Sequence, residues 1–323
     1  MPFWLKPLAA LAAAALTGCA MPSEAPSPPA AAAGRGPGGL MGWPDLTERP
    51  RPTGATTIRY GADSMQVVDL WLPEGRGPHP AVLMVHGGCW QTEIADRRLM
   101  DWIAGDLRDR GIAVWNIDYR GVDREGGGYP GTFLDAAAAA DALREHAPRY
   151  NLDLSPLVAV GHSAGGHLAL WLAARRSPRA SADNLLIPRG SPLRQRDPIP
   201  IHAAISLGGL QDLELAATPP GSGCGTEIVE RLVGPPTLNV RNVYADTSVP
   251  RLLPLGVPQV LINGRQDRII PLHYATDYEA KARAAGDPVR VRMIEGTGHV
   301  ELISPRTAAW EAAVEEIERA LGR

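Results

Sequence analysis

Apolar positions along this chain fall into two alternating patterns. Short apolar runs predict strands, and longer stretches with apolar residues three to four positions apart predict helices. Strands are predicted at 81–85, 112–117, 157–160, 203–207, 257–262 and 289–294, with a half-exposed strand at 64–72. Helices are predicted at 94–110, 132–146, 164–176, 272–285 and 305–321. Gly111 is a plausible cap for the first helix, and Pro148 is expected to stop the second.

Alternating strands and helices favour one α/β fold. Strands that are apolar on both sides belong in a mostly parallel central sheet with helices on both faces. Two stretches interrupt the alternation, at 177–200 and 209–256. Insertions of this kind gather near the carboxyl ends of the strands, where ligands bind. We therefore expect them to form a cap over a site and to set its specificity.

The N-terminus has the pattern of an export signal. Its apolar run at 8–16 is too short to span a bilayer but has the length and flanks of a secretory signal. The run ends in Leu16-Thr17-Gly18-Cys19, which resembles the bacterial lipoprotein processing box; an ordinary signal peptide is the alternative. The Pro-rich, Ala-rich and Gly-rich stretch that follows has no apolar period. The predicted organisation is a signal at 1–18, a lipidated, disordered linker at 19–45 and one folded α/β domain at 46–323.

The lipoprotein resemblance implies a location and bears on the other cysteines. It implies lipidation of Cys19 and attachment to the bacterial cell envelope on the periplasmic side, with the outer membrane favoured. Cys89 and Cys224 would then remain as an even pair in an oxidising compartment, where a disulfide is possible. Two separate thiols are the alternative.

Composition and charge narrow the function. Hydrophobic residues make up 45% of the chain and charged residues 21%, as in a folded globular protein rather than a disordered one. Lys and Arg total 32 against 35 Asp and Glu, a net charge of −3. This balance argues against nucleic acid as a main partner. No cofactor or metal is expected, since no group of Cys and His has ligand spacing, and no protein partner can be inferred.

One short motif carries the chemistry. Gly161-His162-Ser163-Ala164-Gly165 fits the pattern G-x-S-x-G, with an apolar strand before it and a helix directly after it. This is the context of a nucleophile elbow, whose tight turn strains the serine and lifts its hydroxyl above the sheet. The helix that follows directs its N-terminus at a developing anion. Ser163 is therefore the predicted nucleophile.

A serine nucleophile needs a base, and the base needs an orienting acid. In folds with a nucleophile elbow, the acid follows the serine in the chain, and the base follows the acid. His299 comes directly after the last strand and can reach the carboxyl ends of the strands; the other histidines after the elbow are His167, His202 and His273. Asp267 also follows a strand, and Asp212 is its competitor. We predict His299 as base and Asp267 as acid.

The loop after the strand at 81–85 is the candidate oxyanion site. Glycines at 87 and 88 let the backbone approach a substrate closely, so Gly87 and Gly88 are predicted to donate N–H groups together with Ala164. His86 is expected to hold this loop. His162 and Trp90 are candidates for the substrate pocket, although Trp90 could equally be a core aromatic.

Five motifs together resemble the esterase type of α/β-hydrolase over about residues 55–320. They are HGGCW at 86–90, DYRG at 118–121, GHSAGGHLAL at 161–170, GRQDRIIP at 264–271 and GHVELISP at 298–305. The chain is most similar to the branch that holds kynurenine formamidase-like and bacterial acetyl- or feruloyl-esterase-like enzymes. The resemblance implies a serine hydrolase that cleaves small short-acyl carboxylic esters through an acyl-enzyme. An arylformamidase-like amide hydrolase is the alternative, and a catalytically silent envelope lipoprotein is a third possibility.

Overall fold

The computed structural model describes residues 39–176, 186–236, 238 and 241–323. The chain divides into two units at residues 33 and 34, and every described residue belongs to the second unit. The predicted signal, Cys19 and most of the predicted linker lie outside the described residues. Among the helices that are described, none is both long enough and apolar enough to cross a membrane.

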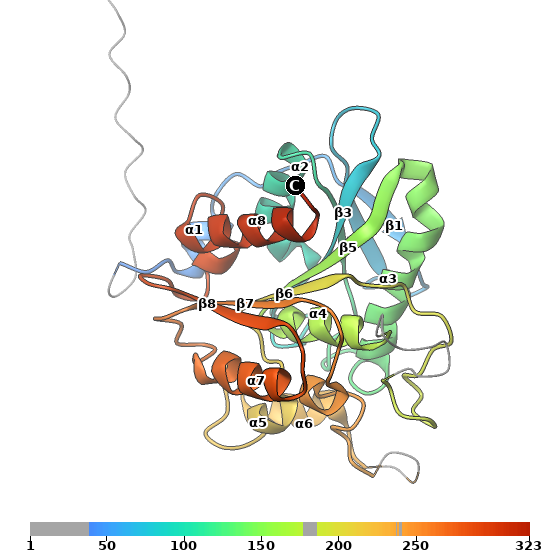
Figure 1. The fold of residues 1–323 in the computed structure, drawn as a ribbon, viewed down its shortest axis with the longest axis vertical. Helices are drawn as coiled ribbons and strands as arrows, with labels where there is room; N and C mark the ends of the chain where they lie inside the picture. The colour runs from blue at the N-terminus through green and yellow to red at the C-terminus, as the bar shows by residue number, and fades with distance from the viewer. Residues whose placement is uncertain (1–38, 177–185, 237, 239–240) are drawn as a thin grey trace, which may run out of the picture. The chain divides into compact units, whose positions relative to one another are not determined.

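An eight-stranded sheet in the order β1-β2-β4-β3-β5-β6-β7-β8 forms the centre of the fold (Figure 1). The strands are β1 (Thr56–Arg59), β2 (Val67–Trp71), β3 (His79–Val85), β4 (Ala113–Ile117), β5 (Leu152–His162), β6 (Ala203–Leu207), β7 (Gln259–Gly264) and β8 (Val289–Ile294). The pairs β1–β2 and β2–β4 are antiparallel, and all the others are parallel. The six strands β4, β3, β5, β6, β7 and β8 are therefore parallel, and their carboxyl ends lie at one edge of the sheet. This is the predicted α/β-hydrolase architecture.

Helices cover both faces of the sheet (Figure 1). They are α1 (Trp43–Thr47), α2 (Asp101–Asp109), α3 (Gly131–Tyr150), α4 (Ala164–Ala174), α5 (Leu213–Ala216), α6 (Thr226–Val233), α7 (His273–Ala284) and α8 (Ala308–Ala320), with 3-10 turns η1 (Arg97–Met100), η2 (Val249–Leu252) and η3 (Glu301–Ile303). Leu83 and Val85 of β3 belong to the core that includes α3, α4 and α7, whereas Val82 and Met84 belong to the core that includes α2 and α8. Successive side chains of a strand point to opposite faces, so each strand contributes to two cores.

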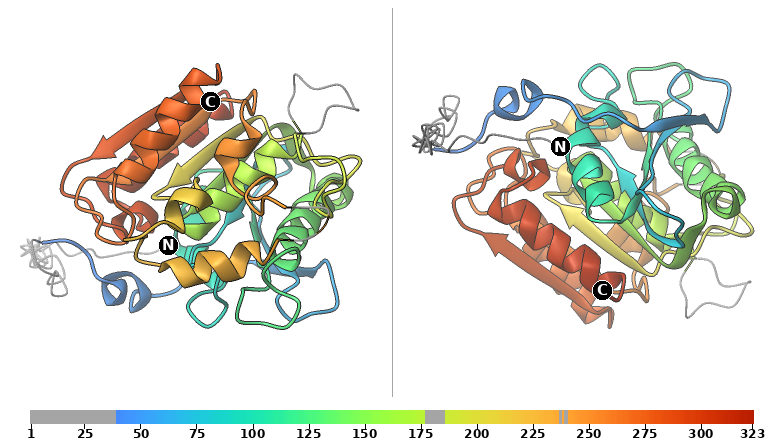
Figure 2. Two further views of the ribbon diagram at one scale, coloured as in Figure 1. Left: turned by 90° about the horizontal axis from the view of Figure 1, so that it is seen from below. Right: turned by 90° about the horizontal axis from the view of Figure 1, so that it is seen from above.

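The second core joins helices far apart in the sequence. Figure 2 shows α2 and α8 side by side, and the indole Nε1 of Trp310 donates to Asp106 Oδ2 at 2.7 Å between them. Arg110 at the end of α2 also pairs with Glu311 of α8 at 2.9 Å. The chain's last helix, which packs on β5, β6 and β7, is thus joined to a helix that packs on β2 and β4.

The predicted strands are present, with differences at their ends and in their exposure. β2 is buried along its whole length rather than half-exposed, because β1 and β4 flank it and both cores reach it. Even Asp69 is buried, where it accepts from Thr57 and Arg97. β1 was not predicted; its four residues are mostly exposed and carry no apolar pattern.

The predicted helices are also present, with two different boundaries. The helix expected from 94 begins only at Arg97, because turns at 91–95 precede it and Asp96 accepts the N–H of Arg98. The helix expected to stop before Pro148 continues to Tyr150. Proline occupies only its last turn, and Asn151 in the left-handed conformation (φ 48°) ends it.

The ordered domain begins earlier than the predicted boundary at residue 46. Residues 39–45 were expected to be linker, but they lead into α1 and are held by the main chain of Met41, which donates to Glu301 Oε1 at 2.6 Å. Leu46 is fully buried in the second core. A contact between residues 260 positions apart fixes this segment, so its local composition could not reveal it.

Candidate active site

Ser163 lies in the sharp turn between β5 and α4. Its φ of 55° and ψ of −123° are strained for a residue with a side chain, as the elbow pattern predicts. The flanking glycines leave no room for a larger residue: a Cβ on Gly161 would lie 2.0 Å from the Gly165 carbonyl, and one on Gly165 would lie 2.2 Å from the Val85 carbonyl. Close packing of strand, turn and helix therefore holds the serine at the carboxyl end of the sheet.

Asp267 and His299 meet in the loops after β7 and β8. His299 Nδ1 lies 2.6 Å from Asp267 Oδ2, and both side chains are buried. The other oxygen, Asp267 Oδ1, accepts the N–H groups of Ile269 and Ile270 at 2.8 and 2.9 Å. These bonds hold the carboxylate in one orientation, and they leave Nε2 of His299 as the ring nitrogen available to a neighbour.

Backbone bonds connect the loop of the acid to the loop of the base. Gln266 donates its N–H to the Thr297 carbonyl at 3.0 Å, and its side-chain Oε1 accepts the N–H of Thr297 at 3.1 Å. Gly264 fits against the same loop so closely that a Cβ there would lie 2.4 Å from the Thr297 carbonyl. The two loops thus form one rigid unit.

Ser163 and His299 line the same cavity, which has a volume of about 390 Å³. Its walls are mainly apolar and include Ile94, Leu99 and Ile269. Ser163 is itself 3% exposed, so a substrate must enter this cavity to reach the hydroxyl. The structure therefore brings the predicted nucleophile, acid and base together at one edge of the sheet. We call this space the catalytic cavity.

The candidate oxyanion donors lie beside the nucleophile. A Cβ on Gly87 would lie 3.0 Å from the Ser163 Cβ, and Gly88 lines the catalytic cavity with φ of 100°. Ala164 is the first residue of α4, where a backbone N–H has no acceptor within the helix. Positive φ values continue through Cys89 and Trp90, so this loop turns sharply beneath the site.

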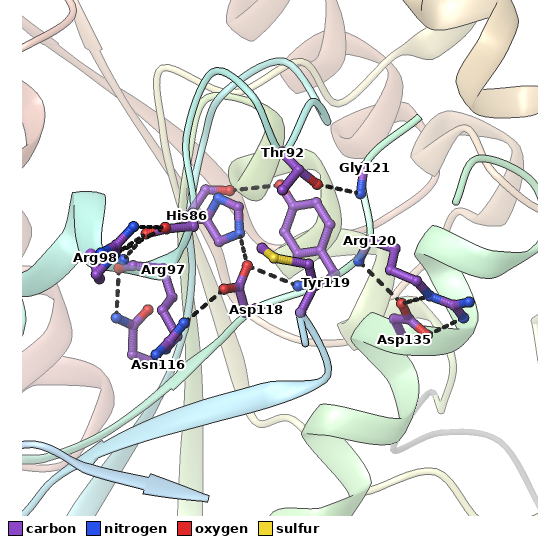
Figure 3. Close-up of polar contacts among 12 residues, drawn as sticks. His86, Thr92, Arg97, Arg98, Asn116, Asp118, Tyr119, Arg120, Gly121 and Asp135 are labelled. Carbon is purple, nitrogen blue, oxygen red and sulfur yellow. Dashed lines mark hydrogen bonds and ion pairs between the residues drawn. The ribbon is translucent and has the colours of Figure 1, made fainter. Parts of the chain in front are cut away.

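A buried polar network holds the loop that starts at His86 (Figure 3). His86 Nδ1 donates to the Gly87 carbonyl at 2.7 Å, and its Nε2 lies 2.9 Å from Asp118 Oδ1. Arg97 reaches the other oxygen of Asp118 at 3.0 Å. The hydroxyl of Tyr119 donates to the His86 carbonyl at 3.0 Å, and its ring stacks on the His86 imidazole. His86 thus has the structural role expected from the sequence, and its partners Asp118 and Tyr119 belong to the DYRG motif at 118–121.

A disulfide links this loop to a second part of the chain. The structure joins Cys89 to Cys224, which are 135 positions apart. Cys89 directly follows Gly88, and Cys224 directly follows Gly223, which also lines the catalytic cavity. Gly223 donates its N–H to the Ile269 carbonyl at 2.8 Å. Covalent and hydrogen bonds thus connect the candidate oxyanion loop to the loop of Asp267.

His162 and Trp90 occupy different places. His162 is buried at the wall of the catalytic cavity, where its Nε2 donates to the His299 carbonyl at 3.1 Å. Burial, with the nearby His299 ring, lowers the pKa of His162 well below its usual value, so its ring is neutral. Trp90 instead takes the core position, fully buried with its ring edge-on to His167 at 5.6 Å. It is not among the residues that line the catalytic cavity.

The side chains of the other candidates for the acid and the base make contacts away from Ser163. Asp212 accepts the N–H groups of Glu214 and Leu215 at the start of α5 and pairs with Lys281. His167 points into the core, where its Nε2 donates to the Thr247 carbonyl at 2.8 Å and burial lowers its pKa to about 4. His202 lies just before β6, at the end of that strand away from the site, and its Nδ1 accepts the N–H of Leu157.

The cavity walls differ from those expected. The described part of the first insertion, 186–200, packs on α3 and α4, where Asp141 accepts the N–H of Ile199 at 2.8 Å. None of its described residues lines the catalytic cavity. The second insertion contributes Gly223. The remaining walls come from α1 and from the turns before α2, two segments that the sequence patterns did not connect with the site. They include Trp43, Thr47, Ile94 and Ala95.

A comparison with protein families places the chain in one of them. The BD-FAE family model matches residues 68–281, more than half of the chain. The chain belongs to the BD-FAE family. This match includes Ser163 and Asp267 and ends before His299.

Solved structures share the fold of this BD-FAE member at low sequence identity. Esterase B from Lactobacillus Rhamnosis (HN001) has a TM-score of 0.67 and 18% identity, covering 83% of this chain and 84% of that one. Est2, an esterase of Thermogutta terrifontis, has a TM-score of 0.63 and 22% identity, covering 85% and 94%. A truncated carbohydrate esterase from gut microbiota has a TM-score of 0.64 and 20% identity, covering 86% and 99%.

One curated relative is much longer. The chain is 26% identical to a non-reducing polyketide synthase (ausA) of Aspergillus calidoustus over 77% of its own length. It spans only 13% of that protein. The similarity therefore concerns one part of a larger enzyme.

Proposed function

We propose that this BD-FAE family member is a serine hydrolase that cleaves small, short-acyl carboxylic esters. One observation carries the proposal. Asp267 holds Nδ1 of His299, and the same histidine lines one cavity with Ser163. A hydroxyl, an imidazole and a buried carboxylate in this order are what acyl transfer to serine requires.

The reaction proceeds in two steps, acylation of Ser163 and hydrolysis of the acyl-enzyme. Nε2 of His299 takes the hydroxyl proton of Ser163 while Oγ forms a bond to the ester carbonyl carbon. The carbonyl oxygen becomes an oxyanion that accepts hydrogen bonds from the backbone N–H groups of Gly87, Gly88 and Ala164. The alcohol leaves as His299 returns the proton to its oxygen. Water then attacks the acyl-enzyme by the same route and releases the acid.

The size and lining of the catalytic cavity support a small, apolar acyl group. A volume of about 390 Å³ lies toward the lower end of ligand pockets, and Ile94, Leu99 and Ile269 give it apolar walls. The esterases with a similar fold agree with ester chemistry. An amide hydrolase of the arylformamidase type uses the same three residues and remains the alternative to test.

A substrate panel separates these possibilities. Acetate, butyrate and octanoate esters of one chromogenic alcohol are compared with an N-formyl arylamine. We expect turnover of the acetate and butyrate, slower turnover of the octanoate, and loss of all activity in Ser163→Ala while the protein stays folded. A clear preference for the formamide would reassign the substrate, and activity retained by Ser163→Ala would refute the proposed mechanism.

We also propose that the protein is anchored in the bacterial envelope through Cys19, which lies outside the described residues. The basis is the lipoprotein-like segment Leu16-Thr17-Gly18-Cys19. The test is metabolic labelling with a fatty acid in cells that make the full chain. Label should enter the original protein and be absent from Cys19→Ala. Equal labelling of both would contradict the anchor.

A further inference from the structure

A second cavity adjoins the catalytic cavity and shares lining residues with it. It has a volume of about 260 Å³ and is lined by the N-terminal segment at 40–43 and by residues of the acid and base loops, including Gln266 and Arg268. We call it the N-terminal cavity. Trp43, Ile269 and His299 line both cavities. Ile269 and His299 belong to the loops of the acid and the base. Trp43 is the shared lining residue that comes from another part of the chain.

The indole of Trp43 stands over the two histidines of the site. Its centroid lies 6.2 Å from the His299 ring and 6.3 Å from the His162 ring, both in edge-on contacts. Trp43 is 37% exposed, although it is a large apolar side chain. An aromatic ring left partly open to solvent beside a candidate base is available for contact with a ligand.

The segment that carries Trp43 is fixed to the loop of the base. One carboxylate, Glu301, joins them: its Oε1 accepts the N–H of Met41 at 2.6 Å, and its Oε2 accepts the N–H of Gly298 at 3.0 Å. Gly298 directly precedes His299. Further along, Arg49 donates to Ser304 at 2.9 Å, and Leu46 is buried in the core. Trp43 is therefore held in register with His299 by contacts that do not involve its own side chain.

The proposed reaction decides which part of an ester faces Trp43. His299 must give its proton to the departing alcohol oxygen, so the alcohol lies on the His299 side of Ser163. The wall on that side is Trp43, with the N-terminal cavity beyond it. Ile94, Ala95 and Leu99, from the turns before α2, line the catalytic cavity but not the N-terminal cavity, and we assign the acyl group to them.

We propose that Trp43 determines specificity for the alcohol part of the substrate by closing the catalytic cavity on its leaving-group side. This inference rests on the proposed ester hydrolysis. Small alcohols fit in front of the indole, and bulky ones meet it. With the indole removed, the two cavities would form one continuous space that reaches Gln266 and Arg268. The preferred substrates of the unaltered protein are thus esters of compact alcohols.

The test compares Trp43→Ala with the conservative variant Trp43→Phe on two ester series. One series keeps an acetyl group and varies the alcohol from small to bulky; the other keeps one small alcohol and varies the acyl length. For Trp43→Ala, we expect the ratio of kcat/KM for bulky over small alcohols to rise about tenfold or more, with the acyl-length profile unchanged. Trp43→Phe should stay near the original ratio.

A reciprocal variant provides the matched control. Ile94 lines the catalytic cavity but not the N-terminal cavity and is 61% exposed, so Ile94→Ala should alter the acyl-length profile and leave the alcohol ratio as it was. Circular dichroism checks that each variant is folded; Leu46, Met41 and Arg49 should keep α1 in place without the indole. If the original protein turns over esters and Trp43→Ala shows an unchanged alcohol ratio, the inference is wrong and the proposed function stands. If the original protein hydrolyses no ester, both are overturned.

Discussion

Cys89 and Cys224 form a disulfide that joins the candidate oxyanion loop to the loop before α6. Each cysteine directly follows a glycine that lines the catalytic cavity, Gly88 or Gly223. A covalent link at this point limits the movement of backbone N–H groups that must face the oxyanion. We therefore expect the bond to affect the proposed catalysis as well as stability.

Loss of the disulfide should lower both stability and activity. We expect the double variant Cys89→Ala/Cys224→Ala to lose about 2–4 kcal/mol of unfolding free energy in urea. Its kcat on an acetyl ester should also fall, because the loop after β3 is no longer tied to the Gly223 segment. Treatment of the unaltered protein with a thiol reductant should give the same result. An unchanged kcat in a destabilised double variant would show that the loop keeps its geometry without the bond.

We expect the contacts of Asp118 with His86 and Arg97 to stabilise the fold by holding the candidate oxyanion loop in place. Asp118 is fully buried, and Asp118→Asn removes the anionic acceptor of His86 Nε2 and of Arg97 Nη1, while Arg97 Nε keeps its pair with Asp69. Breaking a buried ion pair costs about 3 kcal/mol or more, and we expect a loss of that size in the free energy of unfolding. Asp109→Asn is the matched control, since the Asp109 side chain is 69% exposed and its pairing contributes little. Equal stabilities of the two variants would contradict this role.

Asp267 should matter for rate far more than Asp212 does. Asp267→Asn removes the carboxylate that orients Nδ1 of His299, and we expect kcat to fall roughly a thousand- to ten-thousandfold. Asp212→Asn loses a helix cap and the pair with Lys281, so it should be less stable while its kcat stays within a few-fold of the original. A large loss of kcat in Asp212→Asn with an active Asp267→Asn would reverse the assignment of the acid.

Acid should destabilise the fold partly through His167. Burial lowers the pKa of His167 to about 4, whereas in the unfolded chain it lies near 6.5. Between these values the unfolded state binds the proton, so stability is lost as the pH falls from about 6.5 to about 4, by up to about 3 kcal/mol. His167→Gln removes this contribution. Urea unfolding at pH 7 and pH 4.5 should show a smaller loss for the variant than for the original protein.

Other groups do not obscure that comparison. Burial raises the pKa of Asp101 to about 6, so its contribution to stability falls as the pH rises and has the opposite sign. The pKa of His162 is lowered like that of His167. Both are present in the two proteins and cancel in the difference. Parallel losses in both proteins would contradict the role of His167.

Much of the site could be predicted because its parts are local. The turn at Ser163 is contained in five residues, and the strand before it and the helix after it are apolar enough to recognise. Asp267 and His299 follow two parallel strands, whose carboxyl ends share one edge of the sheet. For such residues a position in the chain implies a position in space.

The walls of the catalytic cavity could not be predicted, because distant contacts fix them. α1 has five residues in a Gly- and Pro-containing stretch, and its position depends on the bond between Met41 and Glu301. The apolar pattern places Ile94 in a helix, but the helical segment begins only at Arg97. Ile94 lies in the turn before it and lines the catalytic cavity. Strand β1 lies mostly exposed at the edge of the sheet, so it needs few apolar residues. No apolar pattern therefore marks it in the sequence.

The most direct test of the central claim is to trap the acyl-enzyme. The purified protein is mixed with a chromogenic acetyl ester, quenched in acid during the first turnover and digested for mass spectrometry of its peptides. We expect one acetyl group on Ser163 in the original protein and none on that peptide in Ser163→Ala, with a much slower appearance of the acetyl group in His299→Ala. Ester turnover at full rate in Ser163→Ala, or an acetyl group carried on another side chain, would contradict the account.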